Sequence, residues 1–227
     1  LKIIGTSHIA KQSINEIKNA FEEQQPDIIA IELDLERASS LMEEEQSKRK
    51  ITLSHVPQIG FKGYLFAKIG QYAQQKLGQA DNVTPGAEMK TALKLAAENK
   101  KEVAFIDQPI GITLKNFSKQ LTWKEKYNFI SDLLKGLIFP KRMIHESGLQ
   151  DFDLSKVPEP ELIIKLIKQL RQRYPSIYKT LIDDRNRYMV KKLVQLMRKN
   201  PDKKILVIVG AGHLEGMNEL LLKVDVL

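Results

Sequence analysis

The sequence has no cysteine among its 227 residues. This absence excludes disulfides, a thiol nucleophile and thiolate metal ligands, so any metal must be bound by His, Asp or Glu. No run of 18 apolar residues occurs, and we therefore expect neither a membrane-spanning helix nor a signal peptide in this stretch. The chain begins at Leu1, inside a predicted strand and without an initiating methionine, so we expect it to be a soluble domain of a longer protein.

Aromatic residues are also few, at 7%, whereas the 42% hydrophobic and 28% charged content is typical of a globular protein. The length suits one domain, residues 1–227, with a sizeable core. The net charge of +8 is concentrated between residues 161 and 204, which hold thirteen lysines and arginines against four acids. Such a block can face an anionic membrane surface, or it can be a solvated face. Because few aromatics interleave with these cations for base stacking, we expect no nucleic-acid partner. The sequence leaves a homodimer open.

Four short apolar runs predict strands, at residues 2–5, 27–33, 103–107 and 205–209. Between them lie stretches that predict helices: 13–25 with Ser13 as its cap, 36–50, and one that starts at Thr84-Pro85 and runs to Asn99. Strands that alternate with helices favour a parallel sheet. The expected fold class is therefore α/β, with a mainly parallel central sheet and flanking helices.

Residues 121–200 differ in character and predict a helical insertion or cap within the same domain. Thr122 and Glu125 form a capping box at the start of a helix that should end before Pro140. Two further helices are expected at 160–173 and 176–199.

Two of the four histidines share one local setting, an apolar strand followed by Gly-x-x-His. They are His8, after Gly5, and His213, after Gly210. Because ligands bind outside the carboxyl ends of parallel strands, both imidazoles are predicted at one functional edge of the sheet. A single such histidine is more often structural, but two in matching settings favour a shared site.

Three charged residues are further candidates for this site. Glu32 follows the unbroken apolar run of the second strand, and Glu88 lies in the first turn of the helix after Pro85. Each glutamate can be a metal ligand or a general base. The alternative explanation for Glu32 is a solvated strand end, and for Glu88 it is a favourable interaction with the helix dipole. Arg185 lies on the apolar stripe of its helix, and a buried guanidinium requires an opposing carboxylate, for which Asp107 is the predicted partner.

Six motifs in order along the chain resemble the TraB/PrgY family, whose eukaryotic relatives are the Tiki proteins. They are G-T-S-H at 5–8, I-E-L-D-x-x-R at 31–37, P-G-A-E-M at 85–89, I-D-x-x-I-x-I-T-L at 106–114, D-R-x-x-Y-M at 184–189 and V-G-A-G-H-L-x-G at 209–216.

The resemblance implies a metallopeptidase-like fold with two GxxH motifs and a glutamate. Carried over by position, it implies His8, His213 and Glu32 as metal ligands, with Glu88 and Arg185 at further motif positions. Tiki proteins are regarded as metal-dependent peptidases, and PrgY-type members act against peptide pheromones. It also implies that a membrane segment follows the domain, which would anchor the full-length protein through a C-terminal region absent here.

The chain departs from the family pattern at three places. The family commonly has Asp-Arg where this chain has Asp107-Gln108, a further arginine at Asn116, and Glu-Arg-Asp where this chain has Asp184-Arg185-Asn186. The two lost cations predict altered substrate contacts.

The predicted function is a metal-dependent hydrolase, acting on peptides or protein termini. Two imidazoles and a carboxylate would leave one coordination position open on Zn, Mn, Co or Fe, which activates a water. Glu32 or Glu88 would accept the proton, and Arg185 would stabilise developing negative charge. The main alternative is a catalytically silent protein that binds peptides in the same cleft. A dinucleotide fingerprint is disfavoured, because Gly210-x-Gly212-x-x-x-Gly216 has the wrong spacing.

Overall fold

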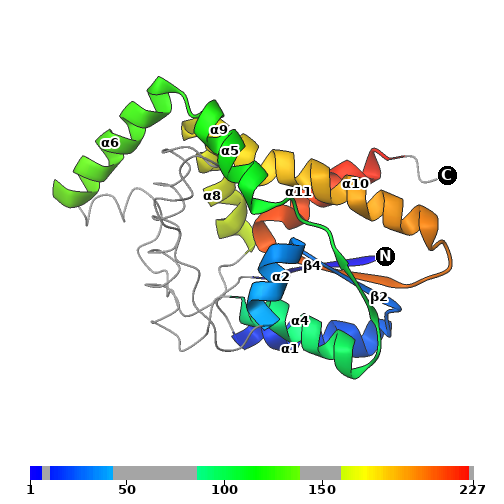
Figure 1. Ribbon diagram of the computed structural model, residues 1–227. Coiled ribbons are helices and arrows are strands. Elements are labelled where there is room, and N and C mark those ends of the chain that lie inside the picture. Colours follow the sequence, from blue (N-terminus) through cyan, green and yellow to red (C-terminus); the bar gives the residue numbers. More distant parts are fainter. Residues whose placement is uncertain (7–10, 43–85, 139–159, 225–227) are drawn as a thin grey trace.

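The computed structural model describes residues 1–6, 11–42, 86–138 and 160–224 of the chain (Figure 1). The predictions that concern His8, residues 43–50 and the start at Thr84-Pro85 lie outside these ranges. Among the described residues, no helix is long and apolar enough to cross a membrane.

A four-stranded parallel sheet forms the centre, in the order β1-β4-β2-β3. The strands are β1 (Lys2–Thr6), β2 (Ile28–Ile31), β3 (Glu102–Phe105) and β4 (Ile205–Gly210). All three pairings are parallel, so the carboxyl ends of the strands lie along one edge. This arrangement confirms the predicted α/β fold class and all four predicted strands.

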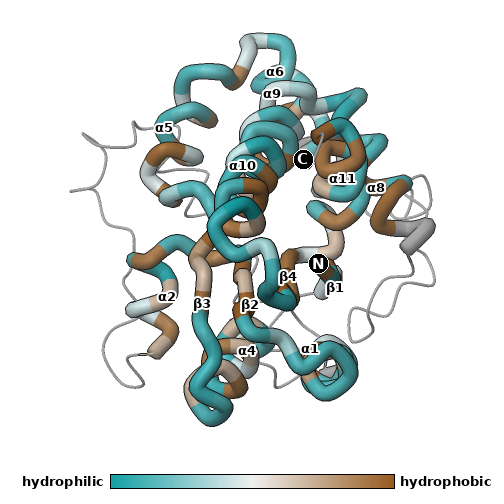
Figure 2. The backbone as a smooth tube through the Cα atoms, turned by 90° about the vertical axis from the view of Figure 1, so that its right-hand side faces the viewer, coloured by the Kyte–Doolittle hydropathy of each residue, from teal (hydrophilic) through white to brown (hydrophobic). Residues whose placement is uncertain are grey.

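Helices cover both faces of the sheet (Figure 1). In β2, the alternation of a strand sends Ile29 and Ile31 to one core and Ile28 and Ala30 to the other. The first core contains residues of α1 (Lys11–Gln24), α2 (Leu35–Met42) and α4 (Ala87–Glu98), and the second contains residues of α10 (Asp184–Lys199) and α11 (Ala211–Leu222). Hydrophobic and hydrophilic residues alternate along α10, as its position between sheet and solvent requires (Figure 2).

The remaining helices lie between β3 and α10 in the sequence. They are α5 (Ile110–Gln120), α6 (Trp123–Ile138), α8 (Pro160–Arg173), α9 (Pro175–Tyr178) and the π-helical segment η2 (Lys179–Asp183). Figure 1 shows α6 extending away from the sheet, whereas α5 lies beside α9. Within the predicted insertion or cap, residues 121–200, the described elements are the helices α6, α8, α9, η2 and α10; α5 precedes this range, and α10 packs directly in the core against the sheet.

Three details differ from the sequence predictions. The first helix starts at Lys11, so Ser13 lies buried within its first turn and is not its cap. The helix α5 lies outside the sequence prediction, because Pro109 directly before it and Gly111 in its first turn are residues typical of a loop. The helix expected over 176–199 contains the π turn of η2, immediately before α10.

The capping box predicted at the start of α6 is confirmed. The Thr122 backbone N–H donates to Glu125 Oε2 (2.9 Å), and the Glu125 N–H donates to Thr122 Oγ1 (3.3 Å). The other carboxylate oxygen of Glu125 accepts from the Ser176 N–H at 2.6 Å, which joins α6 to α9. Burial alone would raise the pKa of Glu125, but these hydrogen bonds from Thr122 and Ser176 outweigh burial and lower it.

Replacement of Glu125 by Ala should lower the free energy of unfolding by about 1–2 kcal/mol, because a cap and an inter-helix hydrogen bond are lost together. Urea denaturation at neutral pH measures this loss. The exposed neighbour Lys124 provides the control, since Lys124→Ala should change stability by less than ~0.5 kcal/mol.

The difference between wild type and Glu125→Ala should also depend on pH. Because the folded pKa of Glu125 is lowered, its contribution is complete above the ordinary value of 4.5 and disappears as the pH falls through the folded value. A difference that stays constant down to pH 2 would contradict the assigned role.

Candidate functional site

The guanidinium of Arg185 lies at the centre of a buried polar cluster. Its Nε donates to Asp107 Oδ1 (3.0 Å) and its Nη2 to Asp107 Oδ2 (2.7 Å), a bidentate pair. Nη2 also forms a salt bridge with Glu32, and Nη1 donates to the Leu181 carbonyl (3.2 Å). Its side chain is 15% exposed, and the predicted pairing with Asp107 is confirmed.

The cluster forms where the parallel strands end. The last residue of β2 is paired with the last residue of β3, and Glu32 and Asp107 follow these strands by one and two residues. On the other side of Arg185, Leu181 belongs to the π segment, whose wider turn displaces its carbonyls from the usual i→i−4 ladder. Burial alone would lower the pKa of Arg185, but the charges of Glu32 and Asp107 outweigh burial and raise it.

Glu32 is fixed by a second element as well. Its Oε2 accepts from the backbone N–H of Gly210 at 2.5 Å, and its own N–H donates to the Ile208 carbonyl at 3.0 Å. The carboxylate is therefore held between the end of β4 and Arg185, with 6% of the side chain exposed.

His213 faces the same cluster from the first turn of α11, and it is 4% exposed. Its Nε2 lies 3.0 Å from Nη1 of Arg185, and a guanidinium only donates, so Nε2 must be the acceptor. The ring proton is thus on Nδ1, which donates to Oδ1 of Asn186 at 2.6 Å. Nε2 also lies 3.3 Å from Oε1 of Glu32, with its lone pair directed into the cluster.

Asn186 and Gly216 together determine this orientation. Asn186 is buried at 2% exposure and contacts α11 one turn beyond the histidine. A Cβ at Gly216 would lie 2.4 Å from the Asn186 Nδ2, closer than any real contact. The last glycine of the V-G-A-G-H-L-x-G motif is therefore required by the side chain that fixes the histidine tautomer.

A second guanidinium lies beside the first. Arg37 forms salt bridges with Asp107 and, at 2.8 Å, with Asp34. Asp34 also accepts from the backbone N–H groups of Arg37 (2.8 Å) and Ile110 (3.1 Å). Burial opposes ionisation of Asp34, but the hydrogen bonds and charge of Arg37 outweigh it and lower the pKa.

The outcome for the predicted site residues is mixed. The structure brings Glu32, Arg185 and His213 together, while His8 lies outside the described residues. Glu88 is 2% exposed and lies in the first turn of α4. This helix packs against β2 and β3 and is antiparallel to the strands, so its first turn lies towards the edge of the sheet where β3 ends. Among the described residues, no group of three His, Asp or Glu side chains has a spacing that could hold a metal.

Sequence reasoning missed Asn186, Arg37 and Asp34 as members of the cluster. Both Asp34 and Arg37 belong to the I-E-L-D-x-x-R motif, and their spacing of three at a helix start is that of an N-cap pair, which was the available signal. For Asn186 no signal beyond its place next to Arg185 was present.

The fold and the cluster define a parallel α/β protein with a buried arginine–carboxylate–histidine centre at the carboxyl edge of its sheet. The chain belongs to the TraB/PrgY/gumN family, whose sequence model matches residues 1–224. It is 34% identical over 227 residues to an uncharacterized protein of Methanocaldococcus jannaschii, a match that covers 98% of this chain and 53% of that protein. The TraB domain-containing proteins of mouse and human are 24% identical over 247 residues, with 96% of this chain and 61% of each relative covered.

The chain thus spans between half and two thirds of the length of these relatives. Among solved structures, an erythromycin esterase mutant in its open conformation matches with a TM-score of 0.33 and 16% identity, over 92% of this chain and 60% of that one. A likeness of this size carries no argument about function.

Replacement of Arg185 by Ala should lower the free energy of unfolding by about 3–5 kcal/mol, because two buried carboxylates lose their counter-charge. The matched control is Arg187→Ala on the same helix. Arg187 is 65% exposed and pairs with Asp183 at 3.2 Å, so its loss should be below about 1 kcal/mol. Equal, small losses in denaturation experiments would contradict the central role of Arg185.

Replacement of Gly216 by Ala should cost about 1–3 kcal/mol through overpacking against Asn186. In an Asn186→Ala background the same substitution should cost nothing, so a double-mutant cycle should give a coupling energy of comparable size. Gly111→Ala is the control, because no heavy atom lies within 4 Å of its added Cβ. An additive cycle would show that Asn186 and Gly216 do not constrain each other.

Proposed function

We propose that this chain is a metal-dependent hydrolase, with His213, Glu32 and His8 as the ligands of a divalent transition metal at the carboxyl edge of the sheet. The observation that carries the proposal is the arrangement of His213. Its Nδ1–H is bound by Asn186, which leaves the Nε2 lone pair 3.3 Å from a carboxylate oxygen of Glu32. Metal-binding histidines are typically oriented in this way through their second ring nitrogen.

The spacing of two described donors, His213 Nε2 and Glu32 Oε1, supports such an ion. Two ligands of one tetrahedral ion, each at about 2.0–2.1 Å, stand about 3.3 Å apart. Among the described residues, the cluster contains three carboxylates, Asp34, Glu32 and Asp107, and the two guanidiniums of Arg37 and Arg185. His8, the third proposed ligand, follows β1, whose last residue Thr6 is paired with Gly210 of β4.

Arg185 now donates to the two atoms that would bind the metal, so binding requires that it release them. Its contacts with both Asp107 oxygens and the Leu181 carbonyl do not involve these atoms and can remain. The guanidinium would then stay beside the reacting centre as a fixed positive charge, suited to an anionic tetrahedral intermediate.

Peptides are the proposed substrates, in line with the family resemblance. The bound metal would polarise the scissile carbonyl and lower the pKa of the attacking water. Because Glu32 is assigned as a ligand, Glu88 is the proposed proton acceptor and later returns the proton to the leaving amine. Arg185 stabilises the oxyanion, and the products are a carboxylate and an amine.

A second candidate is a metal-free protein that binds peptides without cleaving them. One observation favours it: Arg185 already satisfies His213 Nε2 and Glu32 Oε1, so the hydrogen bonds of these atoms are complete without a metal.

Purified protein, dialysed against Zn, Mn, Co or Fe(II), should bind about one equivalent of one of these metals, measured by elemental analysis. His213→Ala and Glu32→Gln should each reduce the bound metal at least ten-fold, since a ligand is lost. His145→Ala is the control, because this histidine is in neither Gly-x-x-His motif.

The metal-loaded protein should cleave peptides from a mixed library, detected by mass spectrometry, and a chelator or Glu32→Gln should prevent cleavage. Equal metal content in wild type and His213→Ala would contradict the proposed site. Peptide binding without cleavage in every metal would favour the second candidate.

A further inference from the structure

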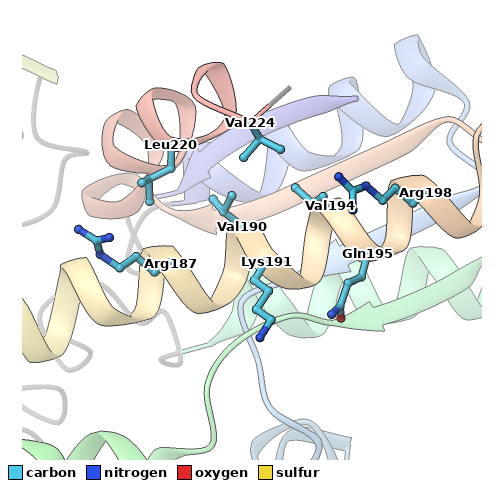
Figure 3. Close-up of a pocket in the computed structure, with 8 residues that line it drawn as sticks. All are labelled: Arg187, Val190, Lys191, Val194, Gln195, Arg198, Leu220 and Val224. Carbon is cyan, nitrogen blue, oxygen red and sulfur yellow. The ribbon is translucent and has the colours of Figure 1, made fainter. Parts of the chain in front are cut away.

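A groove runs between α10 and α11, with a cavity volume of about 380 Å³ (Figure 3). None of its lining residues belongs to the Arg185 cluster. They are Arg187, Val190, Lys191, Val194, Gln195 and Arg198 of α10, with Leu220 of α11 and Val224, which follows that helix.

The floor of the groove is aliphatic. Val190 belongs to the core beneath the sheet, and Val194, Leu220 and Val224 pack against that core while remaining partly exposed. Val194, Leu220 and Val224 thus leave apolar surface exposed along a strip that includes the buried Val190, and a partner could remove this surface from water.

The rim of the groove is cationic, and no carboxylate lines it. Arg187 is partly neutralised by Asp183. Within the described part of the chain, no ion pair joins Lys191 or Arg198 to a carboxylate, and both are exposed. Seven residues separate them along α10, which is two helical turns or about 10 Å.

We propose that this groove is a docking site for an acidic amphipathic α-helix of a partner protein. Aliphatic side chains spaced three or four residues apart would enter the strip formed by Val190, Val194 and Leu220. Carboxylates two turns apart on the same helix would pair with Lys191 and Arg198.

The charge distribution favours this occupant over other anionic amphiphiles. A fatty acid has one terminal charge, whereas the groove has cations spread along its length. A bilayer surface would contact the cationic rim but would not reach the floor of the groove, where Val190 is only 5% exposed. A helix is convex and can insert its apolar side chains between the rim residues.

The test uses a fluorescent 14-residue helical peptide with leucines at i, i+4 and i+7 and glutamates two turns apart on either side. Binding is measured by fluorescence anisotropy. Lys191→Glu/Arg198→Glu should weaken binding at least ten-fold. The matched control is Lys192→Glu/Lys199→Glu, which makes the same charge change at exposed positions of α10 outside the groove and should alter affinity less than two-fold.

A charge-swapped peptide with lysines for glutamates should bind the Lys191→Glu/Arg198→Glu protein better than wild type, a gain that loss of folding cannot produce. Equal weakening by both variant pairs would overturn the proposal, because binding would then follow net charge alone. A second result would also overturn it: the peptide does not bind, whereas vesicles of phosphatidylserine and phosphatidylcholine bind wild type but not Lys191→Glu/Arg198→Glu. The groove would then be a lipid-binding site.

Discussion

The guanidinium of Arg185 connects four segments that are far apart in the sequence. It bonds the residues that follow β2 and β3, the π segment before α10 and the histidine that opens α11. Burial of this charge is favourable only because Glu32 and Asp107 oppose it in hydrogen-bonding geometry. The edge of the sheet, the start of α10 and the start of α11 are therefore held in one relative position by a single side chain.

The orientation of His213 depends on this same charge. Because Arg185 can only donate, it selects the tautomer with its lone pair on Nε2, and the Nδ1–H then requires an acceptor. Asn186, the next residue of α10, supplies it, and Gly216 leaves room for the amide. Two consecutive residues of one helix thus contact the two nitrogens of one imidazole, so α10 determines both the position and the tautomer of the histidine.

The strands and the site edge were predictable because they depend on local patterns. Apolar runs of four to six residues produced β1 to β4, and parallel pairing necessarily brings Glu32, Asp107 and the His213 turn to one edge. Arg185 was recognised because a charge within an apolar stripe requires a partner. Asn186, by contrast, is ordinary in a helix sequence, and its role exists only because α11 packs against it. The π turn likewise has no sequence signal, and α5 was missed because Pro109 and Gly111 are typical of a loop.

The excess of positive charge counted over residues 161–204 divides into two populations in the structure. Arg185 is neutralised in the interior, and Arg173, Lys179, Arg187 and Lys203 each form an ion pair with a nearby carboxylate. The basic outer surface of α10 comes from cations after its first turn. Lys191 and Arg198 line the groove, and Lys192 and Lys199 are exposed outside it. One helix therefore presents opposite electrostatic environments on its two sides. Its inner side contributes Arg185 to a cluster whose described members are three carboxylates and two guanidiniums, and its outer side attracts anions. Because the two sides share a rigid backbone but no side chains, binding at either one can be altered by substitution without changing the charges of the other.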